Sequence, residues 1–367
     1  MQRPASAQEV AELLAEGRVT RPVGGRTKLD WGSPGSPAEL ELSTERLDAV
    51  VEHNAGDLTA VLQAGARLAD AQAVFARAGQ RLALDPPDLG ARATIGGVVA
   101  TSDSGPLRHH YGGVRELVIG VQVALADGTV ARAGSRVIKN VAGYDLAKLM
   151  CGSFGTLGVI CEVIVRLHPQ PVDPVTVLAH GADPRELTRA AGTLRRLPLE
   201  LEALDVRWDG RQGALLAQVA GRAARANAQA IAGQLGDLEV EIVAEDHTLW
   251  EDQRARQRAA ADQQAVARVS FAPAELERVL RASPSAVARA GAGMAWVSLE
   301  PSPEALAALR TAVSPWPCVL LDGPEALRST VDVWGLAEGP ELALMRRVKA
   351  RFDPGGICNR GRFAGGM

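Results

Sequence analysis

Three short segments of this sequence combine glycine with hydroxyl-bearing or basic side chains, the residue types that bind phosphate. They span residues 23–28, 94–105 and 152–158. Glycine lets successive backbone N–H groups point into one concavity, where they can donate to phosphate oxygens. Hydroxyl groups at positions 27, 94, 101, 102 and 104 can add further donors. Three such loops favour a long ligand with an anionic centre, such as a dinucleotide, over a monophosphate.

The stretch 139–160, KNVAGYDLAKLMCGSFGTLGVI, carries glycines at positions 143, 152, 155 and 158. Glycine inside a helix or strand costs about 0.5–1 kcal/mol relative to alanine, so four of them indicate backbone that turns sharply or packs closely against another group. The familiar nucleotide motifs do not fit. There is no G-x-x-x-x-G-K-[ST] loop. GSFGTLG lies between a predicted helix and a strand, the reverse of the order that a Rossmann loop needs. Each loop alone could be a plain turn, and only their co-occurrence favours phosphate binding.

Composition narrows the class of protein. The chain has 367 residues, more than the about 250–300 that one hydrophobic core serves, so we expect two domains. With 47% hydrophobic and 23% charged residues and a net charge of -3, it is typical of a globular protein without a nucleic-acid-binding face. The N-terminus lacks the continuous apolar run of a signal peptide, and no apolar run approaches the ~20 residues that span a bilayer. We therefore expect a cytoplasmic protein.

The four cysteines, Cys151, Cys161, Cys318 and Cys358, show no CxxC spacing. This spacing argues against a zinc site or an iron–sulfur cluster within the chain. Buried, reduced thiols are the interpretation we prefer, and we expect no metal site.

The hydrophobic pattern predicts an α+β fold. In the first part we expect helices over 5–16, 68–78 and 144–150, strands over 21–23, 39–42, 47–53, 59–63 and 159–167, and a hairpin that turns at 126–128. Residues 82–105 are predicted to be rich in turns, and the segment His168-Pro169-Gln170-Pro171 to mark a domain boundary. Beyond it, helices at 185–197, 220–235 and 303–313 and strands at 203–208, 213–219, 239–243 and 293–299 predict helices packed on one face of an antiparallel sheet.

The ordered set VGGRTK, LDPPDLGARATIGGVVATSDSG, PLRHHYGGVRELVIGVQVALADGT, KNVAGYDLAKLMCGSFGTLGVI and FDPGGICNRGRF resembles the vanillyl-alcohol-oxidase-like, PCMH-type FAD-binding family. Within that family it is most similar to the FAD-binding subunits of bacterial glycolate oxidases. The resemblance covers residues 18–170 and resumes in the tail. It implies a PCMH-type FAD-binding domain of two α+β subdomains over 1–170, a smaller α+β domain with an antiparallel sheet and helices over 171–335, and a C-terminal segment, 336–367, that returns to the first domain.

The resemblance also implies how a non-covalent FAD would be held. The pyrophosphate would lie on Gly24, Gly25, Arg26, Thr27 and Lys28. A wall near the flavin would be formed by Asp85, Pro86 and Pro87. The cofactor would be lined by Thr94, Gly96, Gly97, Thr101, Ser102, Ser104 and Gly105. Its distal part would lie on the backbone of Gly158, Val159 and Ile160, and Asn359 of the tail would contact the flavin.

Catalytic candidates follow one another in a loop that the resemblance places near the flavin: Arg108, His109 and His110. A fixed arginine charge there would stabilise the anion of reduced flavin, and a structural ion pair with Asp103 or Glu116 is the alternative. The histidines could act as a base or a covalent flavin anchor, or could simply be surface residues.

Two features of the second domain bear on catalysis. Relatives that oxidise 2-hydroxy acids carry a cluster of histidines and a carboxylate there, which binds a metal and the substrate. The C-terminal half of this chain offers only His180 and His247, far apart in sequence. Arg254, Arg256 and Arg258 are predicted to form a solvated helix face, with binding of a carboxylate or an acidic partner as the alternative.

The resemblance thus predicts the FAD subunit of a glycolate-oxidising or related 2-hydroxy-acid-oxidising complex. Its partners would be a homologous flavin subunit and an iron–sulfur subunit that accepts the electrons, and any contact with the inner face of the membrane would be through them. Two alternatives remain open: an independent FAD-dependent 2-hydroxy-acid dehydrogenase, and a non-catalytic assembly subunit with a flavin-type fold.

Overall fold

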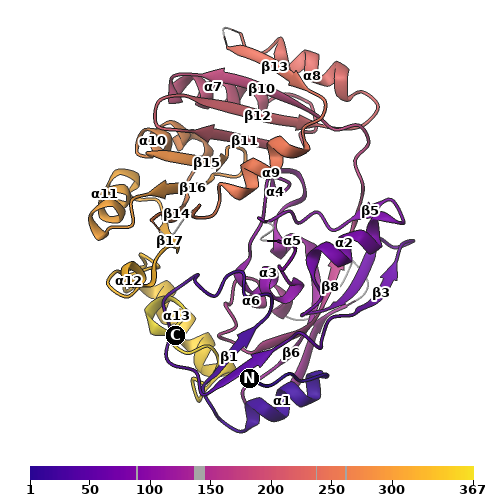
Figure 1. The fold of residues 1–367 in the computed structure, drawn as a ribbon, viewed down its shortest axis with the longest axis vertical. Coiled ribbons are helices and arrows are strands. Elements are labelled where there is room, and N and C mark those ends of the chain that lie inside the picture. Colours follow the sequence, from indigo (N-terminus) through magenta and orange to yellow (C-terminus); the bar gives the residue numbers. More distant parts are fainter. Residues whose placement is uncertain (88–89, 136–144, 237, 261–262) are drawn as a thin grey trace.

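The structure, a computed structural model, describes residues 1–87, 90–135, 145–236, 238–260 and 263–367. Its lower half in Figure 1 is built on a five-stranded antiparallel sheet in the order β3-β4-β8-β6-β7. The strands are β3 (Val50–Asn54), β4 (Thr59–Gln63), β8 (Val159–Arg166), β6 (Val118–Ala124) and β7 (Val130–Gly134). In the central strand β8, side chains that alternate in burial produce the pattern by which the strand is predicted from sequence. Beside this sheet, β1 (Thr20–Val23) and β2 (Leu40–Ser43) form a separate parallel pair.

Helices complete this half of the molecule. They are α1 (Ala7–Ala15), α2 (Leu68–Ala76), α3 (Ile95–Thr101), α4 (Arg108–Tyr111), α5 (Val114–Leu117) and α6 (Leu146–Met150). The region 82–105, predicted to be rich in turns, therefore contains a helix. Two glycines in the first turn of α3 lower its intrinsic helix propensity. The helix forms nonetheless, because Thr94 caps its first turn and Ile95, Val98 and Val99 are buried in the core.

The upper half is an eight-stranded antiparallel sheet, in the order β13-β10-β12-β11-β15-β16-β14-β17 (Figure 1). Its strands are β13 (Glu239–Val243), β10 (Val175–Gly181), β12 (Gly213–Val219), β11 (Ala203–Trp208), β15 (Ser285–Arg289), β16 (Met294–Leu299), β14 (Ala265–Ser270) and β17 (Cys318–Asp322). One face packs in a single core with α7 (Pro184–Leu194), α8 (Ala224–Ala232), α10 (Leu276–Arg281) and α11 (Pro303–Val313). The predicted arrangement of helices on one face holds for these four helices.

The opposite face of this sheet carries α9 (His247–Ala255), which the prediction did not place there. Trp250 of α9 is buried against Leu178 and Leu216, whose side chains point away from the main core. Its indole N–H donates to Thr176 Oγ1 over 2.8 Å. In Figure 1, α9 lies between the two halves of the molecule, so it contributes to their contact.

The C-terminal segment returns to the lower half. After the short α12 (Glu325–Arg328), α13 (Pro340–Phe352) brings Lys349 to the carbonyl oxygen of Thr156, with a donor–acceptor distance of 2.7 Å. Lys349 is held there by a buried ion pair with Asp353 (2.5 Å). Thr20 of β1 then exchanges backbone hydrogen bonds with the tail, donating to Ile357 and accepting from Asn359. These contacts support the division into 1–170, 171–335 and 336–367, which we retain as a proposal.

The predicted boundary at 168–171 is not a bare linker. His168–Pro169 form β9, which pairs with β5 (Gln80–Arg81). Beside it, Arg81 makes an ion pair of 2.6 Å with Glu202. The two halves are therefore joined by a polar contact at the point where the chain passes from one to the other.

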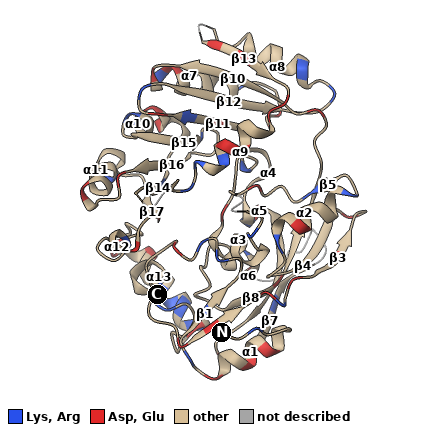
Figure 2. Cartoon of the chain, in the orientation of Figure 1, with Lys and Arg blue, Asp and Glu red and all other residues tan. Residues whose placement is uncertain are grey.

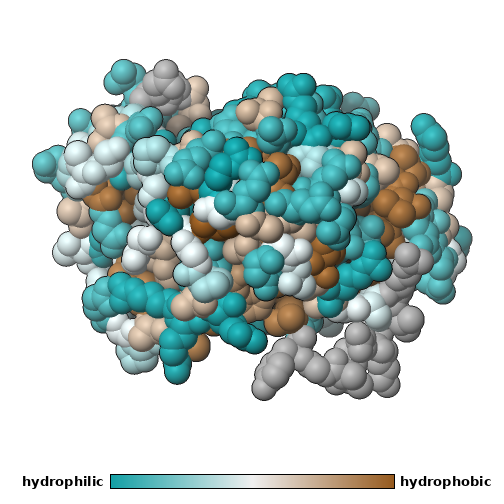
Figure 3. Space-filling view, turned by 90° about the horizontal axis from the view of Figure 1, so that it is seen from below, coloured by the Kyte–Doolittle hydropathy of each residue, from teal (hydrophilic) through white to brown (hydrophobic). Residues whose placement is uncertain are grey.

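The surface is mixed in character. Acidic and basic side chains are interspersed over both halves (Figure 2). At the end that carries α1, hydrophobic residues lie in separate patches among hydrophilic ones (Figure 3). In the part of the chain that the structure describes, no helix is long and apolar enough to cross a bilayer.

The upper sheet depends on one buried ion pair, which yields a stability prediction. Asp205 and Arg289 lie opposite each other on β11 and β15, and both side chains are fully buried. Replacing Asp205 by alanine leaves the arginine charge buried without compensation, which typically costs about 3–5 kcal/mol. Urea unfolding followed by circular dichroism should show a correspondingly lower midpoint for Asp205→Ala. The control is Glu277→Ala, which breaks the exposed pair with Arg281 and should shift the midpoint little; equal shifts would contradict the assignment.

Candidate FAD site

A cleft lies where three segments of the lower half meet. Its walls come from residues 21–29 at the end of β1, from residues 94–101 at the start of α3, and from residues 154–160 leading into β8, with Asn359 and Arg362 from the tail. We call this space the glycine cleft. It brings together most of the predicted cofactor contacts: Gly24, Gly25, Arg26, Thr27, Lys28, Thr94, Gly96, Gly97, Thr101, Gly158, Val159, Ile160 and Asn359.

The backbone N–H groups of the loop 24–28 are available to a ligand. None of its amide groups donates to an acceptor in the part of the chain that the structure describes. Two of its carbonyl groups, by contrast, accept hydrogen bonds: Thr27 O from Arg258 Nη1 over 2.8 Å, and Lys28 O from the backbone N–H of Trp31 over 3.2 Å. Just beyond, Leu29 O accepts from Arg362, and Gly32 O accepts from Arg328 Nη1 over 3.3 Å. A loop whose backbone N–H groups have no acceptor within the described chain is suited to bind an anion.

The glycines serve first to let the segments pack together. A Cβ on Gly25 would lie 1.6 Å from the carbonyl oxygen of Arg92, and one on Gly96 would lie 2.7 Å from Ala64 Cβ. In the stretch 139–160, Gly155 and Gly158 have φ of +69° and +145°, conformations that other residues rarely adopt. Sharp turns and close packing within the chain therefore explain these glycines; Gly143 lies outside the described residues.

Positive charge gathers around the glycine cleft. Arg21, Arg26, Lys28 and Arg362 line it, while its lining contains no carboxylate among the described residues. Arg21 and Arg26 both pair with Glu41, over 2.5 and 3.1 Å, and their hydrogen bonds hold the pKa of that carboxyl below its usual value. Burial lowers the pKa of Arg362 to about 10, so it stays charged at neutral pH. The cleft is therefore electrostatically suited to a dianion.

A second cleft, of about 330 Å³, lies between α3, α4 and the upper sheet. Ser102, Ser104 and Arg108, which are predicted to lie near the cofactor, line this space rather than the glycine cleft. Arg268 of β14 faces them, and we call this space the arginine cleft. Thr101 and Phe154 line both clefts, so the two spaces are adjacent.

Arg108 makes neither of the ion pairs considered for it. Glu116 instead accepts from the backbone N–H of Gly113 over 2.7 Å. The carboxylate of Asp103 pairs with Lys28, whose Nζ lies 3.2 Å from Oδ2. The only side-chain hydrogen bond of Arg108 within the described chain is a long one of 3.5 Å to Ser104 Oγ, and its guanidinium also packs against Gly113. Its charge is thus available to the arginine cleft.

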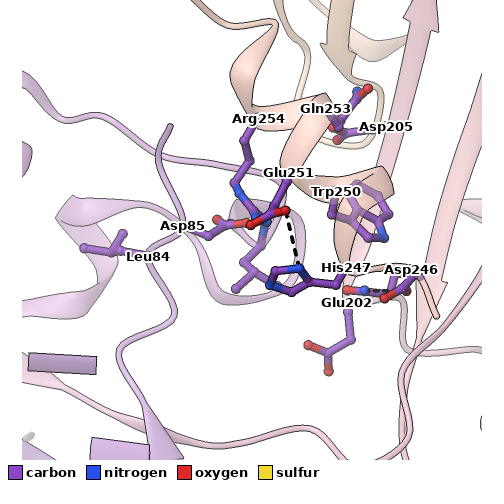
Figure 4. A network of polar contacts seen from close by, with 12 residues as sticks. Leu84, Asp85, Glu202, Asp205, Asp246, His247, Trp250, Glu251, Gln253 and Arg254 are labelled. Carbon is purple, nitrogen blue, oxygen red and sulfur yellow. Dashed lines mark hydrogen bonds and ion pairs between the residues drawn. The ribbon is translucent and has the colours of Figure 1, made fainter. Parts of the chain in front are cut away.

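Asp85, Pro86, Pro87 and Gly105 line neither cleft. The Asp85 carboxylate accepts from the backbone N–H of Leu107 over 3.2 Å and lies 4.0 Å from Arg254 Nη1 of α9, which extends toward it in Figure 4. Burial raises the pKa of Asp85 to about 7. A Cβ on Gly105 would lie 1.8 Å from Asp85 O. This group of residues belongs to the contact between the two halves of the molecule.

The two histidines that are candidates for catalysis also lie away from the clefts. His109 packs against Gly291 of the upper half, where a Cβ would come within 2.1 Å of its Nδ1. Burial lowers the pKa of His109, so the neutral form is favoured there. His110 is exposed and stacks edge-on against Tyr111, with ring centroids 4.5 Å apart.

The prediction that Arg258 lies on a solvated helix face is wrong. This residue lies just beyond the end of α9. Its side chain is 10% exposed and binds Asp322 (2.7 Å) and Asp30 (3.1 Å) in addition to Thr27 O. No local sequence pattern predicts a role for Arg328, Arg362 or Arg268. The partners of Arg258 and Arg328 lie more than 200 residues away, so no local pattern reveals them; for Arg362, its place in the tail motif is the only signal.

Similarity to known proteins agrees with this geometry. Residues 2–134 match the family described as FAD binding domain. Over 148 residues the chain is 37% identical to "Glycolate oxidase subunit GlcE" of Escherichia coli (strain K12), covering 40% of this chain and 42% of that protein. Over 183 residues it is 38% identical to "D-2-hydroxyglutarate dehydrogenase" of Xanthomonas citri pv. viticola, covering 48% and 38%. The chain thus spans about two fifths of the length of these relatives.

The fold as a whole also has a known counterpart. A solved structure of alkyldihydroxyacetonephosphate synthase superposes with a TM-score of 0.72 at 16% identity, covering 97% of this chain and 75% of the other. The predicted α+β fold is confirmed, and FAD is the cofactor that the family match supports. The residues of the glycine cleft fit this group, because free amides and surplus cations suit its pyrophosphate.

Gly97 offers a test of the glycine cleft. It lies in the first turn of α3, and a Cβ there would meet only Thr94 Oγ1, at 3.1 Å. Gly97→Ala should therefore bind FAD almost normally after a small shift. Gly97→Asp adds a negative charge to a cleft for a dianion; each 1.4 kcal/mol of repulsion lowers affinity about tenfold. We expect at least that loss in fluorescence titrations with FAD and an unchanged circular dichroism spectrum. Equal affinity of the aspartate and alanine variants would show that the cofactor is bound elsewhere.

Proposed function

We propose that this chain is the FAD-binding subunit of a complex that oxidises glycolate or a related 2-hydroxy acid and passes the electrons through the flavin to an iron–sulfur partner. The observation that carries the proposal is the glycine cleft, in which the free amides of residues 24–28 meet α3 and the segment 154–160. When bound, FAD supplies the redox chemistry. The chain supplies the binding contacts, the positive charge and the exclusion of water.

The proposed substrate class and the role as a subunit are supported by the similar proteins. One is named as a subunit of glycolate oxidase and another as a dehydrogenase of a 2-hydroxy acid. Each alignment covers less than half of this chain. For this reason the substrate and the partners of the whole chain belong to the proposal.

Proton transfer is the step for which this chain is least equipped. Oxidation of a hydroxy acid needs a base for the hydroxyl proton beside the flavin. Among the described residues that line the two clefts there is no histidine, and the carboxylate of Asp103 is already paired with Lys28. His180 lies on β10 and His247 begins α9, and neither lines these clefts. We therefore propose that a homologous flavin subunit completes the substrate site.

The arginine cleft favours a second candidate, an independent 2-hydroxy-acid dehydrogenase. It adjoins the glycine cleft through Thr101 and Phe154 and presents Arg108 and Arg268, which could bind a carboxylate. A non-catalytic assembly subunit is the remaining alternative and would be colourless when purified.

We predict that FAD is bound without a covalent bond. Burial raises the pKa of Cys151 to about 11 and that of Cys161 to about 12, so neither thiol near the third loop forms the reactive thiolate. The loop 24–28 contains no histidine. Acid precipitation should release the yellow colour into the supernatant. Flavin fluorescence that stays with the protein band in a denaturing gel would contradict this.

We predict that the chain alone does not oxidise its substrate. The purified protein is saturated with FAD and mixed anaerobically with glycolate or D-lactate. The flavin absorbance, whose usual band lies at about 450 nm, is then followed in a stopped-flow instrument. The absorbance should remain within the baseline drift of a control without acid. After co-expression with the proteins encoded beside it, the same mixture should bleach. Rapid bleaching by the chain alone would replace the complex by the independent dehydrogenase.

A further inference from the structure

Exposed apolar side chains gather at the start of α13. Leu336, Leu344 and Met345 are 38%, 52% and 37% exposed. The other large hydrophobic side chains that are exposed in the described chain lie far apart in the sequence, at Met1, Val51, Val172 and Ile242. An apolar cluster on a protein surface usually marks a site of interaction with another molecule, whereas single exposed residues have no such meaning.

A groove of about 490 Å³ lies beside this cluster. Residues 314–319, which lead into β17, and residues 334–336 form two of its walls, and Met345 of α13 and the tail complete it. Because Trp316 and Trp334 are among the lining residues, we call this space the tryptophan groove. A concave apolar wall can receive a protruding side chain of a partner, and such contacts contribute most to the stability of protein interfaces.

Two buried donors in the tryptophan groove have no acceptor. Trp316 Nε1 and Arg268 Nε make no hydrogen bond within the described chain, and both residues line the groove. A buried donor that stays unpaired is destabilising. An acceptor that comes from outside the chain would remove this cost, and a carboxylate is the strongest acceptor for an arginine.

The charge around the groove is positive. Arg268 and Arg310 line it, and no carboxylate does so among the described residues. The exposed charged residues of the segment 338–351 add to this excess, with three cations against two carboxylates: Arg346, Arg347 and Arg351 against Glu338 and Glu341. Of the two carboxylates, Glu338 is already paired with Arg346 over 2.6 Å. The surface is therefore complementary in charge to an acidic partner.

A layer of aromatic rings separates the tryptophan groove from the glycine cleft. Phe154, which lines the glycine cleft, packs edge-on against Trp334 with ring centroids 5.0 Å apart. Trp334 in turn contacts Phe363 with 4.5 Å between centroids, and both of these residues line the groove. A protein bound at the groove would therefore be separated from the cofactor site by one layer of aromatic side chains.

We propose that the tryptophan groove, with Leu336, Leu344, Met345 and Arg347, is the docking surface for an acidic partner protein, which inserts an apolar or aromatic side chain flanked by Asp or Glu. The inference rests on the proposed function in one respect, because it takes this partner to be the protein that accepts electrons from the flavin. Its chemistry follows from the unpaired donors and the surplus cations, and its role from the closeness of the groove to the cofactor site. An anionic membrane fits less well, because a fluid bilayer presents no protruding group of fixed shape.

The first experiment measures assembly. A tagged chain is co-expressed with the proteins encoded beside it, and the amount of each protein retained per chain is quantified by mass spectrometry. Leu344→Asp places a carboxylate opposite an acidic partner, so retention should fall at least about tenfold. The control is Val51→Asp, at a residue 50% exposed on the edge strand β3, on the other side of the molecule in Figure 1. Undiminished retention by Leu344→Asp, or an equal loss in the control, would overturn the docking surface.

The second experiment tests the charge. Arg347→Glu reverses an exposed cation, so the partner should leave the immobilised chain at a lower salt concentration than it leaves the wild type. The control is Arg77→Glu, which reverses an exposed arginine at the end of α2 and should change nothing. Release of the partner from Arg347→Glu at the wild-type salt concentration, or above it, would show that the partner is not acidic. Circular dichroism checks that each variant is folded.

Hydrogen exchange locates the contact and separates the possible occupants. In the wild-type complex, backbone amides of residues 334–347 should exchange more slowly than in the FAD-saturated chain alone. Protection confined to other segments would overturn the docking surface. Binding of the wild-type chain to vesicles of anionic phospholipid that is lost in Leu344→Asp would replace the protein partner by a membrane. A dimer of the chain alone that dissociates in Leu344→Asp would replace it by a second copy.

The two proposals fail separately. If Leu344→Asp assembles like the wild type while glycolate bleaches the flavin of the complex, the docking surface is wrong and the proposed function stands. If Leu344→Asp loses its partner but no 2-hydroxy acid bleaches the flavin of the wild-type complex, the proposed function is wrong and the docking surface stands. A wild-type chain that retains none of the co-expressed proteins would contradict the docking surface as well.

Discussion

The structure depends on three arginines of the C-terminal half that hold the loop after β1. Arg258, Arg328 and Arg362 each donate to a backbone carbonyl between residues 27 and 32. Their guanidinium groups occupy the carbonyl side of the loop, which leaves its amides for an anionic ligand. Of the three, Arg362 also lines the glycine cleft and adds to its positive charge, whereas Arg258 is neutralised by Asp322 and Asp30.

This arrangement means that the FAD site is not a property of residues 1–170 alone. Arg258 joins the loop to Asp322 of β17, and the tail at 357–359 pairs with β1. The arginine cleft likewise takes one wall from α3 and α4 and the other from β14 and β16. The two halves, which have separate sheets and separate cores, thus meet at the arginine cleft, and the glycine cleft lies beside it in the lower half. The contact of Asp85 with α9 adds a further polar link between them.

The sequence predicts the features that depend on residues close together along the chain, and it misses those that depend on contacts between distant residues. Strands β11 and β12 lie at the predicted positions, because alternation of buried and exposed side chains is a local signal. Helix α3 was missed, since its two glycines lower the local helix propensity while its apolar residues find their core only in the fold. The motif around residues 24–28 predicts a binding loop, and these residues line the glycine cleft, whereas the role of Arg258 depends on residues more than 200 positions away. Asp85, a predicted cofactor contact, instead faces α9 because a long-range packing contact turns it there. The unpartnered state of Arg268 is visible only once every neighbouring carboxylate has been placed.

The ion pair between Lys28 and Asp103 has one member in each cleft. Because Lys28 lines one space and Asp103 the other, the pair joins the two clefts electrostatically over 3.2 Å. A charge placed in either space changes the potential in the other, and thermodynamic linkage makes any such coupling reciprocal.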